Sequence, residues 1–346
     1  MSSGPIMIDI EGYTLTPADR SFLCNALIGG VILFARNYKS PEQLTQLINE
    51  IHDLRDPRLL VAVDHEGGRI QRFINDFTRI PPMRYLGHYY DKDKNDACFL
   101  TEKIGWITGS ELRAVGVDLC FAPCVDIDRN LNDVIGDRAF HLSPKIIRDL
   151  AASFCKGLKK AGMASIAKHF PGHGGVSIDS HHALPLDNRS ITKLMDDIYP
   201  YEALNKQRAI AGIMMSHVLY PKIDSLPAGF SSIWIEDYLR SHIGFDGAIF
   251  SDDLNMKAAA GFGSLQERAK IALTAGCDMI LICNDRSAAK LVVKSIDKNL
   301  NPFSMARLAK LYGVGNVSWK KLLGDSEWIK STKYLQDWLI QSGYKI

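Results

Sequence analysis

Short apolar runs recur along the chain, and each is followed by polar residues and then by a segment with helical periodicity. Continuous apolar runs of this length are typical of strands that are buried on both faces, as in a parallel sheet covered by helices. Eight runs have this character: residues 6–10, 30–35, 59–64, 119–127, 164–170, 211–218, 247–253 and 278–283. The pattern therefore predicts eight parallel strands.

The segments between the runs carry helix signals. Residues 190–209 and 264–276 have apolar side chains at helical spacing, and Ser40-Pro41 is typical of a helix start. Strands that alternate with helices predict an α/β protein, a (β/α)8 TIM barrel that forms a single catalytic domain over residues 1–346. A doubly wound open sheet remains the alternative, because a sequence does not show whether a sheet closes.

The C-terminal region, residues 301–346, is more basic than the rest and holds three of the five tryptophans, Trp319, Trp328 and Trp338. We expect it to form two helices that pack on the outside of the barrel rather than a separate recognition module.

Polar side chains follow all eight apolar runs. They include Asp9, Glu11, Arg36, Asp64, Glu66, Asp126, Asp128, Lys168, His169, His217, Asp252, Asp253, Asn284 and Asp285. In a barrel these positions share one face, the C-terminal mouth, where such enzymes have their active sites. Any strand becomes polar where it leaves a core, but eight strands that end this way favour a polar pocket.

Composition sets limits on partners and location. With 41 basic and 39 acidic residues the net charge is +2, which gives no indication of a nucleic-acid or membrane-surface partner. The seven cysteines form no C-x-x-C pair, and we expect buried thiols in a reducing compartment. No secretory signal is visible, and no apolar run approaches the roughly 20 residues of a membrane span. We therefore expect a cytoplasmic protein.

Asp252 follows the seventh apolar run, in the segment GFDGAIFSDDLNM, residues 244–256. A carboxylate at the floor of a pocket is partly desolvated and can act as a nucleophile or an electrostatic stabiliser. The simpler interpretation is the N-cap of the next helix, a role that Asp253 could fill equally well. On these residues alone both interpretations stay open.

An unusually long loop follows the fifth run. The strand ends at His169 and the next helix starts near Ser190, which leaves about 20 residues where βα loops usually have two to six. Such loops are commonly functional, and three glycines within 172–175 are expected to leave this one mobile. Asp179 and His181 combine a carboxylate with an imidazole, a pair suited to proton transfer near neutral pH.

Two other interpretations of this loop are disfavoured. His169 and His173 are four residues apart, but Pro171 and the glycines exclude the helix that gives H-E-x-x-H zinc sites their geometry, and no cysteine is expected close by. The glycines match neither common phosphate-binding motif. We therefore expect no metal and no cofactor.

Other charged residues near the predicted mouth have two interpretations each. Asp64 and Arg72 form either a sugar-binding pair or a structural ion pair, since carboxylates accept hydrogen bonds well from sugar hydroxyls. Arg138 is either a ligand contact or a surface charge. Lys168 either points into the mouth or is an internal partner of Asp64 or Asp126.

Four segments together resemble glycoside hydrolase family three, specifically its bacterial β-N-acetylglucosaminidases. They are DHEGGRIQRF (64–73), GDRAF (136–140), KHFPGHG followed by DSH (168–181) and SDDLNM (251–256), and the resemblance covers nearly the whole chain. The most specific segment is KHFPGHG with DSH, because family-three β-glucosidases have no such Asp-His loop. Many relatives have Asp-Thr in place of Gly175-Val176, a difference that bears on loop mobility rather than on the chemistry.

The resemblance implies a retaining exo-β-N-acetylglucosaminidase that removes terminal N-acetylglucosamine from cytoplasmic muropeptides in peptidoglycan recycling. Carried over by position, it implies Asp252 as nucleophile and His181 as general acid/base, with Asp179 orienting His181. It also implies a set of contacts to the sugar: Asp64, Arg72, Arg138, Lys168 and His169.

The sequence leaves three competing functions open. A phosphorylase would use the same glycosyl-enzyme with phosphate as acceptor, and a neutral histidine repels phosphate less than a carboxylate does. A metal-dependent barrel hydrolase and a non-catalytic sugar-binding barrel are the others. The expected partner is a small carbohydrate bound by a monomer, with no nucleic acid and no membrane.

Overall fold

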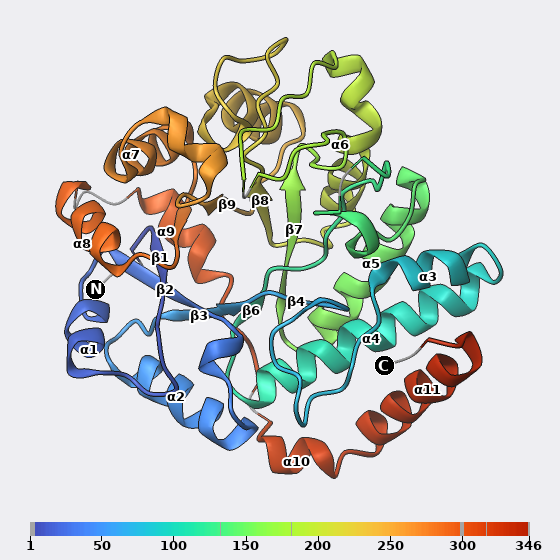
Figure 1. Cartoon of the computed structure of the whole chain (residues 1–346). Helices are drawn as coiled ribbons and strands as arrows, with labels where there is room; N and C mark the ends of the chain where they lie inside the picture. Colours follow the sequence, from blue (N-terminus) through green and yellow to red (C-terminus); the bar gives the residue numbers. More distant parts are fainter. Residues whose placement is uncertain (1–3, 132, 181, 298–300, 316, 345–346) are drawn as a thin grey trace.

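Eight parallel strands close into a barrel in the computed structural model, which describes residues 4–131, 133–180, 182–297, 301–315 and 317–344 (Figure 1). The strands are β1 (Ile6–Asp9), β2 (Ile28–Leu33), β3 (Leu60–Val63), β6 (Leu119–Cys120), β7 (Ala164–Phe170), β8 (Gly212–Met215), β9 (Ala248–Asp253) and β10 (Met279–Ile282). Each overlaps one of the eight apolar runs. The TIM barrel is confirmed, and the open sheet is excluded because β1 pairs with both β2 and β10.

Helices surround the barrel and connect the strands. They are α1 (Pro17–Leu23), α2 (Pro41–Asp53), α3 (Met83–Tyr90), α4 (Lys94–Ala114), α5 (Pro144–Lys160), α6 (Ile191–Lys206), η4 (Ile233–His242), α7 (Leu265–Ala275) and α8 (Arg286–Ser295). Local capping fixes several ends: Ser40 accepts a hydrogen bond from the third residue of α2, and Gly276 ends α7 in the left-handed conformation.

The apolar runs are continuous because both faces of each strand are buried. On β1, Met7 belongs to the cluster inside the barrel, whereas Ile6 and Ile8 belong to the larger layer between sheet and helices. Inside the barrel, Phe121 and Phe250 meet edge to face with ring centroids 5.3 Å apart. The interior is thus a packed core, which leaves the carboxyl ends of the strands as the place for a polar site.

Three helices, not the expected two, make up the C-terminal region: α9 (Pro302–Ala309), α10 (Trp319–Leu323) and α11 (Ser326–Ser342). The chain breaks between α10 and α11 because Gly324 ends one helix and the Asp325 side chain caps the other. Both helices pack against α4 on the outside of the barrel (Figure 1). Among the described residues, no helix has the length and apolar character required to cross a membrane.

Candidate active site

A buried network of charges lies at the mouth of the barrel. Lys168, on β7, places its Nζ 2.7 Å from Asp64 Oδ1 and 2.6 Å from Glu66 Oε1. Glu66, in the short strand β4 (His65–Gly67), also accepts two hydrogen bonds of 2.8 Å from the Arg138 guanidinium. Lys168 is therefore an internal partner of Asp64, not of Asp126, and Arg138 is not a surface charge. Lys168 and Arg138, both predicted sugar contacts, are paired with Glu66, for which the sequence predicted no specific role.

The opposite charges in the network keep Glu66 and Lys168 ionised. Burial alone would raise the pKa of Glu66, but the charges and hydrogen bonds of Arg138 and Lys168 hold that pKa well below its usual range. Burial would likewise lower the pKa of Lys168, and Asp64 and Glu66 instead raise it. Glu66 and Lys168 thus stay charged in a nearly dry site, where removal of one partner would leave an uncompensated charge.

Arg72 joins the network more loosely. It follows the short strand β5 (Ile70–Gln71), which pairs with β4, and its Nη2 is 3.7 Å from Asp64 Oδ2. Its guanidinium carbon lies 5.7 Å from the centroid of the Phe34 ring. Asp64 and Arg72 thus form the ion pair that was one interpretation of these residues. Because the pair is long, a ligand could form hydrogen bonds with both groups.

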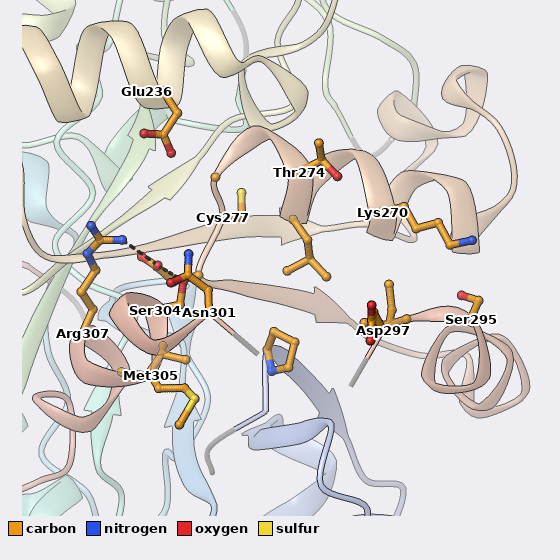
Figure 2. A pocket seen from close by; sticks show the side chains of 16 residues that line it. Glu236, Lys270, Thr274, Cys277, Ser295, Asp297, Asn301, Ser304, Met305 and Arg307 are labelled. Carbon is orange, nitrogen blue, oxygen red and sulfur yellow. Dashed lines mark hydrogen bonds and ion pairs between the residues drawn. The ribbon is translucent and has the colours of Figure 1, made fainter. Parts of the chain in front are cut away.

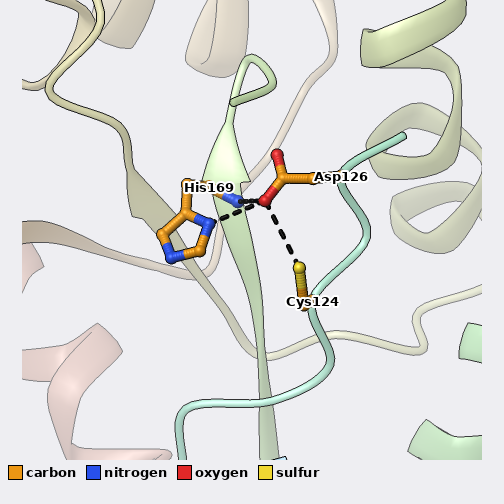
Figure 3. Close-up of side chains that lie close together, drawn as sticks. All are labelled: Cys124, Asp126 and His169. Carbon is orange, nitrogen blue, oxygen red and sulfur yellow. Dashed lines mark hydrogen bonds and ion pairs between the residues drawn. The ribbon is translucent and has the colours of Figure 1, made fainter. Parts of the chain in front are cut away.

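Asp126 organises a second group of side chains (Figure 3). Its Oδ2 lies 2.7 Å from His169 Nδ1, and its two oxygens also accept the backbone N–H groups of His169 and His173. Cys124 Sγ lies 3.4 Å from the same Oδ2. The expectation that no cysteine lies close to these histidines is therefore wrong, because the fold brings Cys124 next to them. These bonds fix the ring of His169 at the mouth.

Cys124, Asp126 and His169 are near enough to one another to be considered as metal ligands. However, Asp126 already accepts hydrogen bonds at both oxygens. Burial raises the pKa of the Cys124 thiol well above its usual range, which opposes the thiolate that a metal requires. These three side chains therefore fit an internal hydrogen-bond network centred on Asp126 better than a metal site.

Asp252 lies on β9 next to the strand's last residue and caps no helix. The following helical segment, η5 (Lys257–Phe262), begins after Met256, and the Asp253 carboxylate accepts the N–H groups of Asn255 and Cys283 instead. Burial raises the pKa of Asp253 to about 7. The N-cap interpretation is therefore wrong for both aspartates.

Neutral imidazoles lie close to Asp252. Burial lowers the pKa of His173 to about 4 and that of His217 in the same direction, and in both cases the Asp252 charge opposes the shift. His217 Nε2 is 3.1 Å from the backbone oxygen of Asp253. Asp252 thus occupies a mouth in which two nearby histidines are uncharged at neutral pH.

Two glycines of the long loop, Gly172 and Gly174, are closely packed, a role that the sequence did not reveal. Residues 171–174 are buried, and the Tyr220 hydroxyl donates to the Gly172 carbonyl. A Cβ on Gly174 would lie 1.6 Å from the carbonyl oxygen of Ile127. Glycine is required here because two backbone segments touch.

The part of the loop around the predicted acid is more exposed. His181 itself lies outside the described residues. Beside it, Ser180 is held by His173 Nε2, 3.0 Å from its Oγ, and its carbonyl accepts the N–H of Ala258 in η5. Asp179, the predicted orienting group, has an oxygen 3.7 Å from the exposed ring of His182. The loop therefore rests on the segment that follows Asp252.

The roles of Glu66, Asp126 and His173 were not predicted from the sequence. All three are polar residues near the ends of strands and are almost completely buried. The first two had been noted as strand-end residues, but their partners are 43 to 102 residues away in sequence, so spacing alone carried no signal.

Two cavities lie at opposite ends of the barrel strands. One of about 280 Å³ lies at the mouth, beside Asp9 and Arg36. A larger one of about 550 Å³ lies between α7 and α9 at the amino ends of β1 and β10 (Figure 2). Its buried Asp278 is already paired with Arg240 and Arg307. Groups at the amino ends of the strands of a TIM barrel usually serve stability.

Comparison with known proteins gives a consistent result. The family described as "Glycosyl hydrolase family 3 N terminal domain" matches residues 7–311. A "Beta-hexosaminidase" from Thioalkalivibrio sulfidiphilus is 50% identical over 331 residues, which cover 96% of this chain and 95% of that protein. The crystal structure of NagZ from Neisseria gonorrhoeae in complex with N-trifluoroacetyl-D-glucosamine is 41% identical, with a TM-score of 0.92 and coverage of 96% and 97%. A glycoside hydrolase family 3 β-N-acetylglucosaminidase from Paenibacillus sp. str. FPU-7 is 30% identical, with a TM-score of 0.86, over 96% of this chain and 67% of that one.

Proposed function

The chain belongs to glycosyl hydrolase family 3 and is a glycoside hydrolase of the β-hexosaminidase type, and on this premise we propose that it is a retaining exo-β-N-acetylglucosaminidase. Its proposed substrate is a cytoplasmic muropeptide, N-acetylglucosamine linked β-1,4 to 1,6-anhydro-N-acetylmuramic acid that carries a peptide. The product would enter peptidoglycan recycling. One observation carries the proposal: a set of paired charged side chains, Lys168 with Asp64 and Glu66, lies at the mouth where the strand that holds Asp252 also ends.

The proposed reaction has two steps. Asp252 attacks the anomeric carbon while His181, as imidazolium, protonates the glycosidic oxygen, and the bond to the leaving sugar breaks. The result is a glycosyl ester on Asp252 and a neutral His181. Water then attacks the anomeric carbon as His181 accepts its proton, which frees Asp252 and retains the β configuration.

A histidine acid needs little adjustment of its pKa. Its ordinary pKa near 6.5 allows both protonation states near neutral pH, whereas a carboxylic acid must be kept protonated by a raised pKa. In the proposal Asp179 stabilises the imidazolium and sets its orientation. Support comes from Ser180, which contacts His173 and accepts the N–H of Ala258 in η5, the segment that follows the strand of Asp252.

The sugar contacts follow from unused donors and acceptors. An ammonium has three N–H groups, and among the described residues Lys168 pairs with Asp64 and Glu66, which leaves one N–H for a sugar oxygen. The Asp64 carboxylate can accept hydrogen bonds from sugar hydroxyls. Arg72, Arg138 and His169 complete the proposed binding set.

Digestion of purified muropeptide tests this proposal. We expect mass spectrometry to show release of free N-acetylglucosamine and of the anhydro-muramyl peptide. Reactions with and without inorganic phosphate separate hydrolysis from phosphorolysis, since a phosphorylase would form N-acetylglucosamine 1-phosphate. No release, or a sugar phosphate as the main product, would contradict the proposal.

A further inference from the structure

Arg72 is positioned mainly by its backbone. Its contacts with Asp64 and Phe34 are long, and its buried Nε has no hydrogen-bond partner among the described residues. The position of the guanidinium therefore depends on the residues on either side of Arg72 in the chain. These are Gln71 before it and residues 73–80 after it. We call residues 73–80 the 73–80 loop.

Gln71 joins Arg72 to this loop. Its Nε2 donates to the carbonyl oxygens of Phe73, at 3.1 Å, and Thr78, at 2.9 Å, while its Oε1 accepts the N–H of Ile80 at 3.0 Å. Gln71 is itself buried. A shift of the 73–80 loop would thus move both neighbours of Arg72.

A stack of aromatic rings connects the loop to α10. Trp319, the first residue of α10, packs on Phe77 with ring centroids 4.8 Å apart. Phe77 packs on Phe73 at 5.5 Å, and both rings contact His65 at 5.7 Å. Phe73 follows Arg72 directly in the chain, so this stack leads from the C-terminal region to the predicted sugar contact.

A second, polar connection leads from α11 to the same loop. Trp328 Nε1 donates to Glu111 Oε1 on α4 at 3.0 Å. The other oxygen of Glu111 accepts the N–H of Thr78 at 3.0 Å, and the Thr78 hydroxyl donates to Oε1. Glu111 is almost completely buried. Loss of any of these hydrogen bonds would leave a buried polar atom without a partner and lower the stability of the fold.

We propose that α10 and α11 hold Arg72 in place for the sugar, with Trp319 and Trp328 as positioning residues that act through the 73–80 loop. The inference rests on the proposed function, because it assigns Arg72 to the sugar. Both helices lie beyond residue 311, where the match to the family ends. They lie outside the matched segment, and their contacts reach the 73–80 loop.

Steady-state kinetics on an aryl β-N-acetylglucosaminide test this inference. We expect Trp319→Leu to raise KM about tenfold with little change in kcat, because Arg72 would bind ground state and transition state alike. Trp319→Phe keeps a ring on Phe77 and should restore most of the affinity. Trp328→Phe removes only the donor to Glu111 and should raise KM less.

Trp338→Leu is the matched control, since Trp338 is a buried tryptophan of α11 that packs on Tyr89 instead. An equal KM in Trp319→Leu and Trp338→Leu would overturn the inference. If Trp319→Leu fails to fold, as judged by thermal unfolding, an unchanged KM in Trp328→Phe would overturn it.

Hydrogen exchange gives a readout that does not need turnover. In Trp319→Leu, but not in Trp338→Leu, the amides of Thr78 and Ile80 should exchange faster than in the wild type. Unchanged exchange would overturn the inference even if the enzyme is active. A wild type without turnover would overturn the proposed function alone, since the exchange still reports whether the helices hold the loop.

Discussion

At the scale of single residues, the mouth separates groups that must stay charged from groups that must change charge. Glu66 holds Lys168 and Arg138 in fixed positions, so these cations present donors without needing water. Asp126 does the same for the ring of His169. The proposed nucleophile Asp252 and the proposed acid His181 have different tasks. A carboxylate can attack the anomeric carbon, and an imidazole can donate and accept a proton near neutral pH.

The acid role of His181 predicts a dependence on the leaving group. We expect His181→Ala to lose about 10² to 10⁴ in kcat/KM on an N-acetylglucosaminide with a poor leaving group, such as an alkyl alcohol or a second sugar. An activated aryl leaving group needs less protonation, so the loss should be smaller. Asp252→Ala, the comparison variant, should lose activity on both. Full turnover by His181→Ala on the poor substrate would rule out the acid assignment.

At the scale of elements, the 168–185 segment shows what a sequence reveals and what it hides. Its length and its Asp-Ser-His sequence single it out as functional, because βα loops are normally short. The role of its glycines is not visible in the sequence, since Gly174 is constrained by Ile127, 47 positions earlier in the chain. A glycine chosen for close packing and one chosen for mobility look alike until the fold brings the neighbour into contact.

Gly174→Ala tests the close contact. A Cβ placed 1.6 Å from a backbone oxygen forces the two segments apart, and we expect a lower Tm and a lower kcat/KM. Gly261→Ala is the control, because a Cβ there meets no atom within 4 Å. Equal Tm and activity in the two variants would show that the loop is mobile, as its sequence alone suggested.

At the scale of the whole molecule, the barrel could be predicted from the sequence because every strand is buried on both faces and so reads as one apolar run. The number of C-terminal helices was predicted wrongly, although the signals for the break, Gly324 and the capping residue Asp325, are local and present in the sequence. The charged network could not be predicted, because Glu66 meets Lys168 only after the barrel closes. The predicted site residues other than His181 are described, and their catalytic and binding roles remain proposals.

Stability should respond to pH through Glu111, whose pKa burial raises to about 7 from an ordinary 4.5. The folded state then binds this proton more tightly than the unfolded state, so the contribution to stability falls as pH rises from about 4.5 to about 7. Denaturant unfolding should therefore show a free energy of unfolding that decreases by up to about 1.4 kcal/mol per pH unit relative to Glu111→Gln. The exposed Glu42→Gln should behave like the wild type, and equal slopes in all three proteins would contradict the prediction.

The central claim is that the mouth accepts N-acetylglucosamine as its sugar. The most direct test compares kcat/KM of the wild-type protein on two substrates with the same aryl leaving group, the β-N-acetylglucosaminide and the β-glucoside. We predict a preference of about 10² or more for the N-acetyl sugar, because a site built to bind a polar group leaves its own partners unpaired when that group is missing. Comparable values on both substrates would contradict the account.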